Sequence, residues 1–163
     1  MNANINITSG NINIGNCKEA NLKTTSGVIR AGNSQTGRYQ ATSGGVHIGE
    51  VDVADIKVTS GTIKAEKANK ITAKATSGSI AVNEINGFCD LYCSSGTIKV
   101  EKCYLNENSS IRTTSGGVVV KETNNIFIDA HATSGGVKVN ESDRKSDVEL
   151  KISTTSGGIK VNQ

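Results

Sequence analysis

The triplet Thr-Ser-Gly recurs along the chain, and a serine beside a flexible glycine could act as a nucleophile. Serine hydrolysis needs a base and an orienting group close to one serine. The nearest match to the GxSxG nucleophile elbow is GNSQTG at residues 32–37, and its spacing is wrong. The two histidines, His47 and His131, belong to different copies of the repeat and have no column of carboxylates beside them. The triplet therefore predicts a structural corner, and we expect no enzymatic activity.

The acidic residues do not form a catalytic or metal-binding pattern. Glycan-cleaving enzymes need a pair of clustered carboxylates. Here Glu50, Glu84, Glu122 and Glu141 recur six residues after a triplet glycine, which predicts a solvated ridge. The chain has no CxxC pair and no metal-like spacing between cysteine and histidine. We therefore expect neither a cofactor nor a metal.

The four cysteines are Cys17, Cys89, Cys93 and Cys103. Cys89 and Cys93 are four residues apart on one strand, or about 13 Å, which is too far for a disulfide. A link from Cys89 to Cys103 across the core of one coil is geometrically open. Small buried thiols are the favoured interpretation.

Composition favours thin β-layers over a thick core. The chain has 163 residues, of which 35% are hydrophobic and 3% aromatic, with 18 glycines and no proline. A net charge of +3 is too balanced to indicate nucleic acid or an anionic membrane as a partner. No apolar stretch is long enough to span a bilayer, and the first residues lack a signal-peptide pattern. We expect either a cytoplasmic protein or a piece of a longer exported one.

The triplet, with Ser-Ser-Gly in one copy, recurs at intervals of 17 to 22 residues. Its glycines are Gly10, Gly27, Gly44, Gly61, Gly78, Gly96, Gly116, Gly135 and Gly157. Such regularity is the signature of a repeat protein. The glycines predict sharp corners, because glycine reaches positive φ without steric cost.

Each copy contains two strand-like segments around the triplet. The residues two and four positions after the glycine are apolar in every copy, and the residue between them is mostly polar or basic. A similar alternation precedes the triplet, with inward positions five and three residues before the glycine. This is the period-two pattern of half-buried strands. If it continues into the triplet, the serine points inward and the threonine outward.

One such unit cannot bury its own apolar face, so the copies must stack. We predict an all-β fold, a single-stranded β-helix or β-solenoid of about nine coils with a repeat of about 17 residues, as one domain over residues 1–163. Coils about 4.8 Å apart give a rod about 40 Å long. An antiparallel sandwich is the alternative. The repeat does not set the handedness.

Two partly basic stripes remain on the outside. The candidate binding surface follows the position three after the glycine, at Arg30, His47, Lys64, Lys99, Lys138 and Lys160. The second stripe lies four positions before the glycine and includes Lys23, Lys57, Lys74 and Arg112. These charges favour solubility and protection against sheet stacking. The alternative is a site for an anionic polymer, such as an acidic glycan, or for another protein.

The lengthened repeats and the ends offer further surfaces. Extra residues fall in CYLNENSS (103–110) and NESDRKSD (140–147), which we expect to bulge as neutral loops or as binding loops. The chain begins inside a coil, and open solenoid ends are edges that can pair. Either a longer protein covers one end, or the ends meet other subunits.

The segments TSGNINI, TSGTIKAEKA, TSGSIAVNEI, SSGTIKVEKC and TSGGVKVNES resemble the repeats of a bacterial domain family of unknown function that is often labelled an adhesin. Many members have Asp after the glycine, where this chain has other residues. The resemblance implies a β-helix without enzymatic activity and an envelope location. The leading prediction is a non-enzymatic adhesin or envelope-associated interaction module. The alternative is a cytoplasmic scaffold that assembles end to end.

Overall fold

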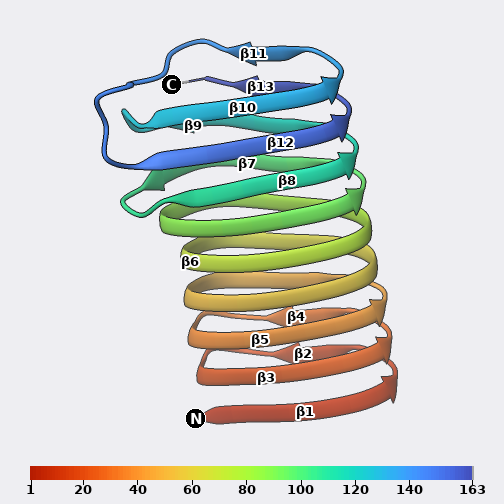
Figure 1. Ribbon diagram of the computed structural model, residues 1–163. Helices are drawn as coiled ribbons and strands as arrows, with labels where there is room; N and C mark the ends of the chain where they lie inside the picture. Colours follow the sequence, from red (N-terminus) through yellow and green to blue (C-terminus); the bar gives the residue numbers. More distant parts are fainter. Residues whose placement is uncertain (163) are drawn as a thin grey trace.

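The computed structural model describes residues 1–162 and shows a β-solenoid of about nine turns (Figure 1). No helix occurs in this part of the chain. The predicted fold class is therefore confirmed. The strands are β1 (Asn2–Ser9), β2 (Ile12–Ile14), β3 (Cys17–Ser26), β4 (Ile29–Ala31), β5 (Ser34–Ser43), β6 (Val46–Ser95), β7 (Ile98–Leu105), β8 (Ser109–Ser115), β9 (Val118–Thr123), β10 (Phe127–Ser134), β11 (Val137–Val139), β12 (Glu149–Ser156) and β13 (Ile159–Val161).

All the strand pairs are parallel, and their register follows the triplet. Ser9 pairs with Ser26, Ser26 with Ser43, and Ser43 with Ser60. Each turn has a longer stretch before the triplet and a shorter one after it, so the solenoid has a long-strand face and a short-strand face. In the middle of the rod the chain is continuously extended, and β6 alone makes several turns.

The core lies between these two faces and is built from the predicted inward columns. Residues two and four positions after the glycines are buried through the whole middle of the rod, as Ile63 and Ala65 illustrate. Leu22, Tyr39 and Ile56 fill the column on the opposite face, with no exposed surface. At both ends of the rod the same columns become partly exposed, because only one side is covered by a neighbouring turn.

The corner explains why glycine is required. Gly27 has a φ of +139°, and a Cβ there would overlap the carbonyl oxygen of Gly10 in the turn below. Its N–H donates to the carbonyl of Ser43 in the turn above at 2.9 Å. Glycine therefore provides both the backbone conformation and the close approach between turns.

The predicted direction of the triplet serine is wrong. The serines, including Ser26 and Ser43, are exposed, because the chain turns at the triplet and places them on the outside of the corner. The inner polar group comes instead from the residue two positions earlier. The Thr24 hydroxyl is buried and donates to the Gly10 carbonyl at 3.4 Å. The predicted outward threonines, such as Thr25, are exposed as expected.

The last two turns do not follow the order of the sequence. β12 pairs with β8 on one side and with β10 on the other, and β13 lies between β9 and β11 in the same way. The final turn is therefore inserted beneath the turn made by β10 and β11, which forms the end of the rod (Figure 1). Residues 140–148 are the connection that returns the chain to the lower level, and they include the segment 140–147 that was expected to bulge as a loop.

Side-chain size favours this order at two columns. The inserted turn has Ile152 and Ile159, both buried, where the end turn has the smaller Ala130 and Val137. Leu150 and Ile128 share a third column and are similar in size. Placing the bulkier turn between two neighbours removes more apolar surface from water, at about 25 cal/mol per Å².

Candidate binding surfaces

The first three residues of the predicted surface lie together on the short-strand face. Arg30 pairs with His47 in the parallel ladder, and Lys64 follows on the next turn. They line a shallow hollow of about 220 Å³, together with Glu66. Burial lowers the pKa of His47, and the charges of Lys64 and Arg30 lower it further. The hollow is thus a small cationic site.

The other predicted residues do not continue this site. Lys99 stands between the uncharged Ala81 and Val119. Its ammonium group binds the Glu101 carboxylate at 2.7 Å, and Lys121 binds the second oxygen of that carboxylate. The hydrogen bond from Lys121, followed by that from Lys99, lowers the pKa of Glu101.

Lys138 and Lys160 are neighbours at the far end of the rod. Val119 pairs with Lys160 on the other side, so the uncharged Val119 separates this pair from Lys99 in the column. The predicted stripe is therefore three separate patches and not a continuous surface.

A longer basic surface lies on the long-strand face. We call it the lysine–threonine groove. It is a shallow depression of about 460 Å³ that crosses several turns. Its charged side chains are Lys23, Lys57 and Lys74. A parallel row of exposed threonine hydroxyls belongs to Thr42, Thr59 and Thr76.

The three lysines of the groove have no ion-pair partner within the described residues. Gln40 stands between Lys23 and Lys57 in the ladder. The groove ends at Tyr92, whose hydroxyl accepts a hydrogen bond from Ser94 at 3.1 Å. That hydrogen bond lowers the pKa of Tyr92. Beyond it, Arg112 is paired with Asp90 at 3.3 Å, so along this column the unpaired positive charge ends with the groove.

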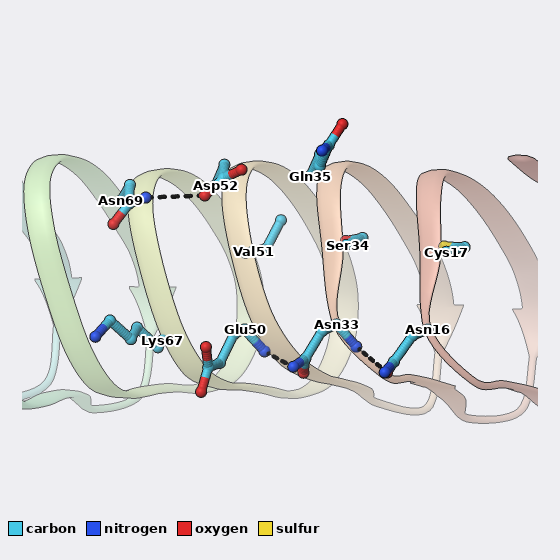
Figure 2. Close-up of a pocket in the computed structure, with 10 residues that line it drawn as sticks. All are labelled: Asn16, Cys17, Asn33, Ser34, Gln35, Glu50, Val51, Asp52, Lys67 and Asn69. Atoms are coloured by element: carbon cyan, nitrogen blue, oxygen red, sulfur yellow. Dashed lines mark hydrogen bonds between the residues drawn. The ribbon is translucent and has the colours of Figure 1, made fainter. Parts of the chain in front are cut away.

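A second groove, of about 340 Å³, follows the looser corner (Figure 2). Figure 2 shows two rows of polar side chains with inward residues between them. The upper row is Gln35, Asp52 and Asn69, and the lower row is Asn16, Asn33, Glu50 and Lys67.

The polar groups of this corner groove mainly bind one another. The Asn16 side-chain oxygen accepts from the Asn33 backbone N–H at 2.8 Å, and the Asn33 oxygen accepts from the Glu50 N–H at 2.9 Å. Asn69 donates to Asp52 at 2.9 Å. Each bond joins one turn to the next. The asparagines therefore stabilise the corner, and few of their groups are left for a ligand.

The thiols of Cys89 and Cys103 meet in the core. Both are fully buried, and all four cysteines are free, as the favoured interpretation predicted for the buried thiols. Cys17 differs because it is only half-buried near the end of the rod. The hydrogen bond with Cys103, together with burial, raises the pKa of the Cys89 thiol. No group of three metal-binding side chains occurs within residues 1–162.

The family model described as Toastrack DUF4097 matches the chain twice, at residues 1–86 and at residues 39–162. The two overlapping matches cover nearly the whole sequence. The chain belongs to the Toastrack DUF4097 family. No curated protein and no solved structure matches it. The family is one of repeat β-domains of unknown function, in agreement with that part of the resemblance, and an adhesin label is not part of this match.

The lysine–threonine groove of this Toastrack domain corresponds to the second basic stripe of the sequence analysis, which was not the candidate binding surface. The signal for the lysine–threonine groove is the combination of two columns, four and two positions before the glycine. The first provides Lys23, Lys57 and Lys74, and the second provides threonine in almost every copy. Only the structure shows which lysines are paired with acids. Within the described residues there is no helix long and apolar enough to cross a membrane.

Proposed function

We propose that this Toastrack domain is a non-enzymatic interaction module that binds an anionic polymer along the lysine–threonine groove. An acidic glycan of the cell envelope fits this description, and an adhesin would use such a surface. The observation that supports the proposal is the set of three unpaired ammonium groups, Lys23, Lys57 and Lys74, on one face of the rod.

The spacing of the groove suits a linear polyanion. Turns are about 4.8 Å apart. Lys57 therefore lies about one strand spacing from Lys74 and about two strand spacings from Lys23. Like charges this close repel one another, and a polymer with regularly spaced carboxylates would relieve the repulsion. The flexible lysine side chain can meet a carboxylate without a fixed geometry. The threonine hydroxyls alongside can bind either donors or acceptors of a sugar.

The corner groove is less suited to bind a polyanion than the lysine–threonine groove. Lys67 lies there, but its ammonium group binds the Glu84 carboxylate at 2.9 Å. The hydrogen bond to Glu84 raises the pKa of Lys67, and the same bond lowers the pKa of Glu84. A polyanion would have to displace that carboxylate, whereas the groove lysines have nothing to release except water and counter-ions.

Equilibrium binding to polygalacturonate, a linear carboxylated glycan, tests the proposal. The triple variant Lys23→Gln, Lys57→Gln and Lys74→Gln should bind about tenfold more weakly, since each exposed ion pair contributes about 0.5 kcal/mol. The affinity of the wild type should fall as salt is added.

A second triple variant provides a control with the same change in net charge. Lys18→Gln, Lys102→Gln and Lys145→Gln replace exposed lysines outside the groove. This control should keep the wild-type affinity, and uncharged dextran should not bind. Equal weakening in the two triple variants would show that only net charge matters and would reject the groove as the site.

The open ends of the rod favour a second function, a structural scaffold that assembles end to end. Among the described residues β1 pairs only with β3, and β10 pairs only with β12, so each end presents a strand edge without a described neighbour. Such edges pair readily with other strands. Sedimentation velocity of the full chain over a concentration series tests this function, because a scaffold must show species larger than the monomer.

A further inference from the structure

The first turn of the rod is unusual because it has no charged side chain. Residues 1–17 contain asparagine at nearly every outward position and no Lys, Arg, Asp or Glu. Inward-pointing Ile5, Ile7 and Ile14 are only half-buried there. Natural edge strands are normally protected by lysine, proline or a bulge. The strand at this edge has no lysine or other charged residue, and the chain has no proline.

The opposite end has the complementary shape. Its outermost strand, β10, has Ala130 and Ala132 at the two columns where β1 has Ile5 and Ile7. Next to them on the short-strand face, Val137 is 44% exposed. At these two columns small residues at one end correspond to large residues at the other, and at the next column Ala3 corresponds to the larger Ile128. Stacking one end on the other would bury these side chains in the same way as they are buried inside the rod.

Backbone polarity gives the direction of stacking. At each internal corner, the glycine N–H donates to the serine carbonyl of the next turn, as Gly157 does to Ser134 at 2.9 Å. Two residues later a second N–H does the same, as Ile159 does to Gly136 at 2.9 Å. At the end turn the corresponding donor is the N–H of Val137, and no described strand lies beyond it.

The first turn presents the matching acceptors. By the same repeat, the carbonyls of Ser9 and Asn11 occupy the positions that accept from a preceding turn. No such turn precedes them in the described chain. At the corner, the donors without a neighbouring turn lie at one end of the molecule and the matching acceptors at the other, which suits head-to-tail contact between copies.

We infer that a second copy of this chain stacks head to tail on the first, with β1 of one copy pairing in parallel with β10 of the other. Ile5 then lies against Ala130, Ile7 against Ala132, and Asn4 beside Asp129. This interface deepens the scaffold function proposed above by specifying its partner and register. A head-to-tail contact that does not close on itself produces filaments. Each subunit adds about 40 Å to the length, as nine strand spacings require.

Proline at Val137 tests the backbone contact. Val137→Pro removes the N–H that faces the other copy, and proline is tolerated at an edge strand when its missing donor faces outward. Val137→Thr is the matched control, because it removes apolar surface but retains the N–H. We expect Val137→Pro to remain a monomer with an unchanged circular dichroism spectrum, and Val137→Thr to assemble.

A charge exchange tests the register. Asn4→Asp places a carboxylate beside Asp129 of the neighbouring copy and should weaken assembly severalfold. Adding Asp129→Asn to the same chain should restore assembly, because one carboxylate again faces one amide. Asn13→Asp, on the same turn but opposite Lys138, should not weaken assembly and serves as the control.

Sedimentation velocity and electron microscopy of the full chain provide the readout. Rods whose lengths are multiples of one subunit support the inference. If rods form but neither Val137→Pro nor Asn4→Asp affects them, the register is wrong while the scaffold function survives. If the wild type stays a monomer at the highest concentration reached, both fail, and another occupant, such as a further segment of a longer chain, must cover the first turn.

Discussion

Replacing a corner glycine by alanine should destabilise the rod, whereas replacing the glycine next to it should not. Gly116 has a φ of +142°, and a Cβ there would overlap the carbonyl oxygen of Gly96. Its neighbour Gly117 has no positive φ, and the nearest atom to its added Cβ is the Gly158 oxygen at 3.5 Å. The two positions differ in conformation and space but not in residue type or location.

The magnitude follows from these two differences. A non-glycine residue in such a backbone conformation costs about 1–3 kcal/mol. The overlap adds to this, because the backbone of the turn below cannot rotate away as a side chain can. Separating the turns also weakens the bond from the Gly116 N–H to the Ser156 carbonyl, now 2.8 Å long. We expect Gly116→Ala to lose at least about 3 kcal/mol of the free energy of unfolding, and Gly117→Ala to change it by less than about 1 kcal/mol.

Thermal unfolding followed by far-UV circular dichroism measures the difference. For a chain of this length, 1 kcal/mol corresponds to about 2–4 °C, so Gly116→Ala should lower the Tm by about 6–12 °C. Gly117→Ala should stay within a few degrees of the wild type. Equal Tm values for the two variants would refute the conclusion that close approach at the corner sets the spacing of the turns.

Two further outcomes test the order of the turns and the cationic hollow. Ser110→Cys with Lys151→Cys should form a disulfide on mild oxidation, since these residues are ladder partners, whereas Ser110→Cys with Asp129→Cys should not, because two strand spacings, about 10 Å, separate them. The reverse result would mean that the turns stack in sequence order. The pKa of His47, followed by NMR, should lie below its ordinary value and should rise in Lys64→Gln, because one repelling positive charge is removed. No rise in that variant would mean that the two side chains do not share one site.

The fold could be predicted because the spacing between the triplet glycines determines which residues of successive turns share a column. Glycines such as Gly27 and Gly44 mark the corners, and the apolar positions on either side then become the core. The serine of the triplet was placed wrongly because strict alternation assumes an extended chain. At Ser26 the chain is already turning, which moves that side chain outside.

The order of the last turns could not be predicted from the repeat. Every turn offers the same backbone edge in the same register, so either β10 or β12 can stack on β8 with equal alignment of the triplet. The difference lies in how much apolar surface each order buries. Ile152 and Ala130 occupy the same column but differ in size, and only the assembled rod shows which of them lies at the end.

The candidate surface was predicted only in part. A column assignment shows that Lys64 and Lys99 point outward, and both do. It does not show that Glu101, two residues from Lys99 on the same face, binds that lysine. Ion pairing depends on the distances between side chains within and between turns, and a column assignment does not give these distances. For the same reason the free lysines of the long-strand face were not separated from the paired ones.

The most direct test of the proposed function is an NMR titration of the 15N-labelled chain with oligogalacturonate. If the lysine–threonine groove is the site, the amide shifts should concentrate at Thr42, Thr59 and Thr76 and at the lysines beside them, and added salt should reverse them. Shifts concentrated instead at Asn33 and Glu50 in the corner groove, or no shifts at all, would contradict the proposal.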